Sequence, residues 1–259
     1  MHGIRSCLAA LIVLLAAVAP VRAAEVHKFC YAHWPPKYIH DKSMSAPAGA
    51  SIRVARLLFL RAGLDAELIK MPWKRCILAV QGDRMDGILG VAGGRADIVY
   101  PTHSWNAGAF YVWVRADAPQ QAFEGPEQRK GKTIGGVVGY QDLEMVRQVE
   151  GIEINTSPDD KTVFRKLRRG TIDGALAAMA VGRNLALQQH PPPRPLHPAW
   201  HAADLYIGLS KANAGLADAL DAATLALLRD GTVDRIFLED LGFTLTEYYR
   251  SLGREPYWR

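Results

Sequence analysis

The sequence predicts an α/β protein built from two lobes that two strands join. Short strand runs alternate with helical spacing of apolar residues in the first part of the chain, and this alternation restarts after a segment rich in Pro and Gly at 119–131. Two long apolar strands, near 109–115 and 204–210, lie where the chain would leave one lobe and later return to it. Two such crossings can form a hinge.

The first lobe is predicted to open with a β-α-β-α-β run. Its expected elements are, in order, strand 26–31, helix 50–62 ended by Gly63, strand 66–71, helix 73–81 and strand 85–91. A rigid aromatic loop, His33-Trp34-Pro35-Pro36, follows the first strand. Such a run implies a parallel sheet with right-handed crossovers.

The second lobe repeats this logic. Its expected elements are strand 133–138, helix 141–148, strand 152–155, helix 162–169 and strand 172–177. A Pro-rich connector at 190–198 then leads to an apolar strand at 205–210 and an amphipathic helix at 216–229. We therefore expect one lobe to comprise residues 24–112 plus 206–259, and the other to comprise residues 113–205.

The N-terminus has the pattern of a secretory signal peptide covering residues 1–23. Arg5 precedes an apolar run from Cys7 to Val18, and small residues at Ala23 and Ala24 provide a cleavage site. The alternative is a retained membrane anchor, but the run is shorter than the roughly 20 residues that span a bilayer. We expect an exported, periplasmic protein.

The mature chain is only mildly basic. Removal of Arg5 and Arg22 with the signal peptide lowers the formal charge from +5 to about +3. The one dense basic group consists of Arg165, Lys166, Arg168 and Arg169, and it is flanked by Asp159, Asp160 and Asp173. This pattern indicates a solvated helix face and argues against a nucleic-acid partner.

Two cysteines, Cys30 and Cys76, remain in the mature chain. Because exported thiols tend to oxidise, we expect them to form a disulfide. Two buried free thiols are the first alternative. A catalytic cysteine is the second, and no nucleophile and base set accompanies either residue.

Several motifs, in this order along the mature chain, resemble the bacterial extracellular solute-binding proteins of family 3, the polar amino-acid uptake type. They are Pro72–Cys76 leading to Gly82–Gly87, then Lys166–Gly174, and finally Leu205–Lys211 followed by Leu228–Thr232 and Ile236. The resemblance implies a type II periplasmic-binding-protein fold, in which two α/β lobes enclose a ligand cleft and two hinge strands join them. It also implies a protein that closes around a small, carboxylate-bearing or polar metabolite and presents it to an ABC permease.

The resemblance also suggests ligand-binding residues. Arg95 follows a Gly-rich turn that starts at Gly90, and it is similar to the family's arginine that grips the ligand carboxylate. A surface arginine paired with Asp97 is the alternative. Gly139 and Tyr140 open a helix where an anionic group could bind, unless they form a simple tight turn.

Three aromatic residues, Tyr31, Trp34 and Trp73, are candidates for stacking on the ligand, with ordinary packing as the alternative for each. Ala178 stands where the family's amino-acid binders carry an acidic residue that holds the ligand ammonium. This departure favours a carboxylate without an ammonium, or an apolar or aromatic molecule contacting Met179.

Other functions stay open. The alternatives are an accessory or sensory periplasmic subunit for an oxidoreductase or a receptor and, less favoured, an enzyme on the same fold, for which Asp86 or His103 would be tested first. We expect a monomer without cofactor. We expect no metal site either, because Pro198 interrupts the spacing between His197 and His201.

Overall fold

The computed structural model describes residues 25–40 and 43–259. The predicted signal peptide, residues 1–23, lies outside the described residues. Helices and strands alternate through most of the described chain, as predicted. Within that part, no helix is both long and apolar enough to cross a membrane.

The first lobe contains the predicted β-α-β-α-β run, with ends shifted by at most two residues. Its elements are β1 (Val26–Tyr31), α1 (Ala50–Arg61), β2 (Asp65–Lys70), α2 (Trp73–Gln81) and β3 (Gly87–Ala92). Strand β1 pairs in parallel with β2 on one side and with β3 on the other. The parallel sheet of this lobe is therefore confirmed.

The second lobe is a smaller parallel sheet with helices. Its elements are β5 (Thr133–Val137), α3 (Gln141–Arg147), β6 (Glu153–Ser157), α4 (Asp160–Arg168), β7 (Gly174–Ala178) and α5 (Met179–Ala186). Strand β5 pairs in parallel with both β6 and β7. Helix α5 was not predicted, because it begins directly after β7 and its N-cap, Ala178, offers no capping side chain.

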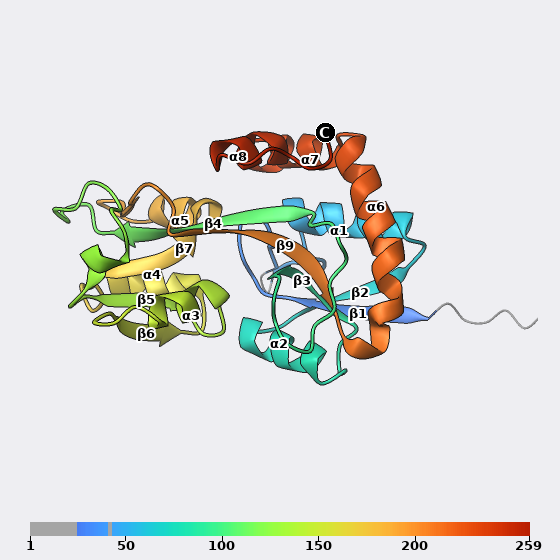
Figure 1. The fold of residues 1–259 in the computed structure, drawn as a ribbon, viewed down its shortest axis with the longest axis horizontal. Coiled ribbons are helices and arrows are strands. Elements are labelled where there is room, and N and C mark those ends of the chain that lie inside the picture. Colours follow the sequence, from blue (N-terminus) through green and yellow to red (C-terminus); the bar gives the residue numbers. More distant parts are fainter. Residues whose placement is uncertain (1–24, 41–42) are drawn as a thin grey trace, which may run out of the picture.

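Two long strands, β4 (Asn106–Val114) and β9 (His201–Leu209), connect the lobes. They pair antiparallel with each other, while β9 also pairs with β3 and β4 with β7. The sheet order is thus β2-β1-β3-β9-β4-β7-β5-β6, with the short β8 (Arg194–Pro195) beside β4. Figure 1 shows β4 and β9 running between the two groups of elements, which confirms the predicted pair of crossings.

The C-terminal part returns to the first lobe as α6 (Ala217–Arg229), α7 (Thr232–Leu241) and α8 (Leu245–Ser251). Helix α8 contacts both crossing strands. The amide of Ala109 on β4 donates a 2.6 Å hydrogen bond to the Tyr248 hydroxyl. Asp204 on β9 accepts hydrogen bonds from the Tyr249 hydroxyl and, at 2.6 Å, from Arg254 Nη2. The C-terminus therefore braces the hinge of the molecule (Figure 1).

Cys30 and Cys76 form the predicted disulfide, which joins β1 to α2. Both residues are fully buried, and apolar side chains that include Ile77, Val80 and Ile88 surround them. The alternative of two free thiols is therefore wrong in this structure.

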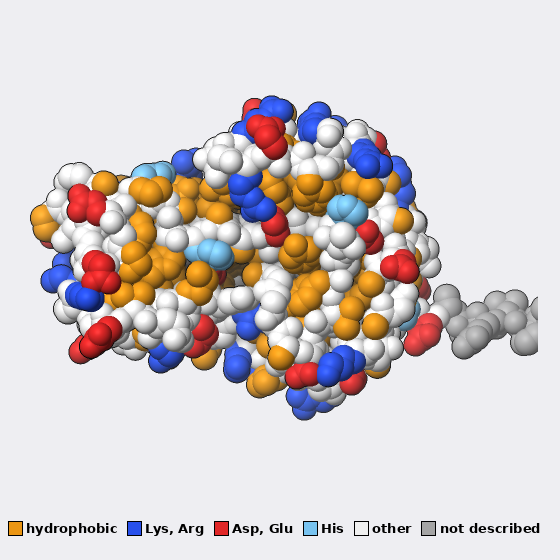
Figure 2. All heavy atoms as spheres, in the orientation of Figure 1, with side chains coloured by type: hydrophobic (Ala, Val, Ile, Leu, Met, Phe, Trp, Pro, Cys, Tyr) orange, Lys and Arg blue, Asp and Glu red, His pale blue; other side chains and the backbone are white. Residues whose placement is uncertain are grey.

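The surface shown in Figure 2 mixes charges of both signs. Hydrophobic side chains gather in the middle of this face, and Lys, Arg, Asp and Glu side chains lie mostly around its periphery. Near the predicted basic group, Lys166 Nζ donates a 2.6 Å hydrogen bond to Asn155 Oδ1, and Asp159 caps α4.

Candidate functional site

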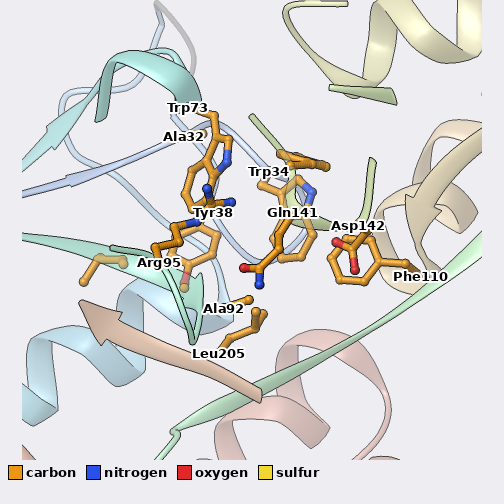
Figure 3. A pocket seen from close by; sticks show the side chains of 13 residues that line it. Ala32, Trp34, Tyr38, Trp73, Ala92, Arg95, Phe110, Gln141, Asp142 and Leu205 are labelled. Atoms are coloured by element: carbon orange, nitrogen blue, oxygen red, sulfur yellow. The ribbon is translucent and has the colours of Figure 1, made fainter. Parts of the chain in front are cut away.

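A cavity of about 50 Å³ lies at the junction of the two lobes, between the crossing strands and the ends of α2 and α3. It is lined by Ala32, Trp34, Tyr38, Trp73, Leu89, Gly90, Ala92, Arg95, Phe110, Tyr140, Gln141, Asp142 and Leu205. Figure 3 draws these lining residues and labels most of them. The lining is mainly apolar with a few polar groups, as in many binding pockets for small molecules.

Five aromatic side chains form the walls of this cavity. Ring centroids lie 6.5 Å apart for Trp34 and Phe110, and 6.3 Å apart for Trp34 and Tyr38. Tyr140 meets Phe110 and Trp73 edge to face, at 6.4 and 6.0 Å. Such walls can hold an apolar or a cationic part of a ligand.

Contacts between the lobes close the cavity on the side of Arg95. Both Arg95 Nη2 and Trp73 Nε1, from the first lobe, donate hydrogen bonds to the carbonyl of Gly139 in the second, at 2.8 and 3.2 Å. In the opposite direction, Gln141 Nε2 donates to the Gly93 carbonyl at 3.2 Å. These three hydrogen bonds join the two lobes beside the cavity.

The Arg95 guanidinium is half buried, and burial lowers its pKa from the ordinary arginine value. Its Nε atom is buried and has no hydrogen-bond partner among the described residues. Asp97 instead pairs with Lys211 at 2.6 Å, so the alternative of a surface Arg95–Asp97 pair is wrong. Arg95 thus keeps a donor available within the cavity wall.

Two acidic side chains lie close to the aromatic walls. Asp142 is only 5% exposed, and burial raises the pKa of its carboxyl to about 7. Asp160 is similarly buried, burial raises its pKa to about 7, and its Oδ2 accepts a 2.9 Å hydrogen bond from the Tyr140 hydroxyl. Both groups gain protons more readily than ordinary carboxyls do.

A second cavity of about 470 Å³ adjoins the first, and the two share Ala32, Trp73 and Tyr140 as lining residues. Asp160 lines this second cavity, whereas Asp142 lines the first.

Most of the predicted binding residues meet at this site. Trp34, Trp73, Gly90, Arg95 and Tyr140 line the cavity, and Gly139 contributes its carbonyl.

Tyr31 and Ala178 do not line this cavity. Tyr31 is fully buried in the core, where its hydroxyl shares a 2.6 Å hydrogen bond with His40 Nδ1. Ala178 lines a separate cavity of about 490 Å³, together with Lys37 and Met179. Tyr31 is the last residue of β1, and its neighbour Ala32 lines the cavity instead. Ala178 pairs with Phe110 within the sheet, and Phe110 is the one of the two that lines the cavity.

The sequence analysis missed Tyr38, Phe110, Gln141 and Asp142. An available signal was the position of Asp142, which lies two residues after Tyr140 on a predicted helix. The burial of this carboxylate was not visible in the sequence, because it results from tertiary packing that also places Asp142 Oδ1 3.8 Å from His201 Nε2 on β9.

The two residues suggested for an enzymatic role have other partners. Asp86 accepts hydrogen bonds from the Lys28 amide at 2.6 Å and from Asn213 Nδ2 at 2.9 Å. His103 Nδ1 lies 2.8 Å from Asp221 Oδ2, and its ring stacks on Tyr257. Neither residue lines the cavity.

Comparisons with known proteins identify the family of this chain. The family model of bacterial extracellular solute-binding proteins, family 3, matches residues 29–239. The L-cystine-binding protein TcyJ of Escherichia coli strain K12 is 22% identical over 203 residues, which cover 77% of this chain and 76% of that protein.

Solved structures share the fold. The substrate-binding protein of an amino acid ABC transporter has a TM-score of 0.72 at 18% identity, covering 84% of this chain and 100% of that chain. ArtJ, an arginine-, lysine- and histidine-binding protein of Geobacillus stearothermophilus, has a TM-score of 0.73 at 16% identity, covering 85% and 96%. A histidine kinase sensor domain similar to periplasmic binding proteins has a TM-score of 0.76 at 18% identity, covering 85% and 98%.

Proposed function

The chain belongs to the bacterial extracellular solute-binding proteins of family 3, with their two-lobed type II periplasmic-binding-protein fold, and we propose that it binds a small carboxylate-bearing or polar metabolite in the periplasm and presents it to an ABC permease. The cavity between the lobes is the proposed binding site. The proposed ligand-binding residues are Trp34, Trp73, Arg95, Gly139 and Tyr140.

The main support for the proposal is the position of Arg95. Its half-buried guanidinium lies in the wall of the cavity between the two lobes. Its Nη2 touches the second lobe and its Nε has no partner among the described residues. A ligand carboxylate could accept from this donor, since a guanidinium forms strong charge-assisted hydrogen bonds with carboxylates. The named ligands of the two relatives, cystine for TcyJ and arginine, lysine and histidine for ArtJ, all carry a carboxylate, which supports the same chemistry.

Closure of the two lobes would allow a permease to distinguish the ligand-bound protein from the free protein. A ligand that touches Arg95 of one lobe and Tyr140 of the other makes its full set of contacts only when the lobes are together. It therefore shifts the population towards the closed state by its difference in affinity for the two states. A permease can then recognise the closed protein.

We test this proposal with a thermal-shift screen of the mature protein against amino acids, organic acids, amines and aromatic metabolites, followed by calorimetry. A ligand of the native state should raise the unfolding midpoint as its concentration rises. A panel without any such compound would contradict the proposal.

Replacement of Arg95 tests the site itself. Arg95→Ala should weaken binding of the ligand about tenfold or more, because hydrogen bonds to charged groups contribute roughly 1.5–3 kcal/mol. Arg84→Ala is the matched control, since Arg84 is exposed in the same lobe and does not line the cavity. Equal affinity of a folded Arg95→Ala protein would remove Arg95 from the site.

A second candidate is a sensory or accessory role, which the similarity to a histidine kinase sensor domain favours. Deletion of the gene separates the two roles when uptake of the radiolabelled ligand and the transcriptional response to it are both measured. Loss of uptake supports delivery to a permease. Normal uptake with a lost response supports sensing.

A further inference from the structure

A separate cavity of about 490 Å³ lies on the opposite face of the crossing strand β4 from the proposed binding site. Phe110 and Tyr111 are neighbours on β4, and the side chains of successive strand residues point to opposite faces. Phe110 lines the cavity of the proposed binding site, whereas Tyr111 lines this separate one. Figure 1 shows α8 above β4 and both α2 and α3 below it.

Each lobe supplies one wall of this space, which we call the α5–α8 cavity. Helix α5 of the second lobe contributes Met179 and Leu187, and the first lobe contributes Phe243 and, from α8, Tyr248. The centroids of the Phe243 and Tyr248 rings are 5.5 Å apart. The match to the family model ends at residue 239, so this aromatic wall lies beyond the matched part of the chain. The volume and the apolar walls suit a small molecule with a hydrophobic body.

The charges in the lining of the α5–α8 cavity have one sign. Lys37, Arg183 and His197 line it, and no Asp or Glu does so within the part of the chain that the structure describes. Arg183 is exposed, and its guanidinium takes part in no hydrogen bond or ion pair with another described residue. Such a lining favours an anionic ligand, and a guanidinium suits a carboxylate in particular.

Tyr111 adds a hydrogen-bond donor without a partner. The residue is 8% exposed, and its hydroxyl forms no hydrogen bond to any described residue. Burial raises the pKa of this hydroxyl, so it keeps its proton and can donate. Because buried polar groups are normally hydrogen-bonded, a ligand oxygen in the α5–α8 cavity would satisfy this donor.

Lys37 places a buried amine in the same lining. It is only 3% exposed, and its Nζ donates hydrogen bonds to Asn106 Oδ1 at 2.7 Å and to the Ala107 carbonyl at 2.9 Å. Both acceptors are neutral, so these bonds leave the charge of the ammonium form uncompensated. Burial lowers the pKa of this amine to about 7, and a carboxylate in the cavity would stabilise its charged form.

We propose that the α5–α8 cavity is a second ligand site, which binds a small carboxylate with an apolar or aromatic body. The Tyr111 hydroxyl and the Arg183 guanidinium hold the carboxylate, and Lys37 stabilises its charge. Phe243 and Tyr248 pack against the body of the ligand. The inference goes beyond the proposed function and does not depend on it, because none of these residues lines the cavity of the proposed binding site.

Calorimetry of the mature wild-type protein tests the chemical class of the ligand. The probes are two carboxylates, phenylacetate and octanoate, together with the neutral phenylacetamide and the cationic 2-phenylethylamine. We expect one of the carboxylates to bind at least tenfold more tightly than the amide and the amine, because only a carboxylate matches the basic lining. If neither carboxylate binds, or if the amine binds as tightly, the inference is wrong and the proposed function is unaffected.

Two substitutions test the residues of the site. Tyr111→Phe removes only a hydroxyl that has no partner in the protein, and Arg183→Gln changes an exposed side chain, so both proteins should fold. Each should weaken binding of the better carboxylate by about tenfold. The matched control is Arg169→Gln, since Arg169 is exposed in the same lobe and does not line the cavity, and it should bind like the wild type. Full affinity of both test variants would mean that the carboxylate binds elsewhere.

Photo-crosslinking locates the ligand without any variant. A phenylacetate that carries a diazirine on its ring is irradiated with the wild-type protein, and the labelled peptides are identified by mass spectrometry. Labels within residues 178–187 and 241–251 that excess phenylacetate suppresses support the inference. Labels within residues 89–95 or 140–142, at the cavity of the proposed binding site, contradict it.

Discussion

Gly90 has a backbone conformation that residues with a side chain adopt only with strain, and it lies against a wall of the proposed site. Its φ is +72°, and a Cβ atom there would lie 2.5 Å from the Tyr38 hydroxyl. The absence of a side chain at Gly90 therefore lets Tyr38 take its place in the lining. Glycine is therefore required at position 90 for two reasons: the positive φ of its backbone, and the close approach of the Tyr38 side chain.

Substitution of Gly90 separates these two causes. Gly90→Ala should destabilise the protein by about 2–4 kcal/mol, from backbone strain plus the contact with Tyr38. Gly63→Ala is the control, because Gly63 has a similar φ of +69° and a Cβ added there would meet no atom within 4 Å. It should cost only the strain, about 1 kcal/mol. Urea unfolding measures both, and equal losses would show that Tyr38 moves away without cost.

The raised pKa values of Asp142 and Asp160 have a consequence for stability. Each folded-state pKa is about 7, against an ordinary value of 3.8. Between these limits the folded protein binds more protons than the unfolded chain, so each group makes the unfolding free energy fall as pH rises. The slope is about 1.4 kcal/mol per pH unit for each group.

Asp142→Asn removes one of these two contributions. The stability of the variant relative to the wild type should therefore increase by about 1.4 kcal/mol per pH unit from pH 4 towards pH 7, and level off above that. Urea unfolding at pH 5, 6, 7 and 8 without ligand checks this. A difference that is constant across the range would mean that the Asp142 carboxyl is ionised in the folded protein throughout.

At the scale of single elements, the disulfide fixes the start of α2 against β1, and Trp73 opens that helix beside the cavity. The bond closes a loop with a sequence separation of 46 residues. Its main expected effect is to restrict the unfolded chain, and so to stabilise the fold by about 4 kcal/mol.

The double substitution Cys30→Ser with Cys76→Ser should lower the unfolding free energy by about that amount. Dithiothreitol should lower the midpoint of the wild type and leave the variant unchanged. If the reductant has no effect on the wild type under unfolding conditions, the bond does not contribute to stability.

The order of strands and helices could be predicted because it depends on local patterns. Apolar runs, Gly63 after α1 and the Pro-rich connector were sufficient to place most elements to within a few residues. The strands β4 and β9 begin earlier than predicted. Asn106, whose residue type is rare in strands, pairs with Leu205 of β9, and His201 pairs with Phe110 of β4, so pairing between the two strands extends them.

The site was predictable where the family resemblance, an aromatic loop or a helix start marked a residue. Arg95 was predicted from its likeness to the family's arginine and Tyr140 from its place at the start of a helix, whereas Phe110 and Asp142 meet in the cavity only through tertiary packing. Tyr31 shows the opposite error, because an aromatic residue at a strand end entered the core. Which side of a strand end faces the cleft depends on tertiary packing, which one sequence does not reveal.

At the scale of the whole molecule, two strands and a C-terminal brace connect two lobes around the cavity of the proposed binding site (Figure 1). In the described part of the chain, the Gly139 carbonyl accepts hydrogen bonds from Arg95 and Trp73, and Gln141 donates one to Gly93, across this cavity. We expect a ligand to add to these contacts when the lobes are together. We expect β4 and β9 to flex while the packing inside each lobe is preserved.

Small-angle X-ray scattering of the mature protein, with and without a saturating ligand from the thermal-shift screen, tests closure most directly. If the ligand holds the lobes together, its addition should reduce the radius of gyration, and the Arg95→Ala protein should need a correspondingly higher concentration for the same change. Identical scattering of the free and saturated protein would contradict ligand-driven closure.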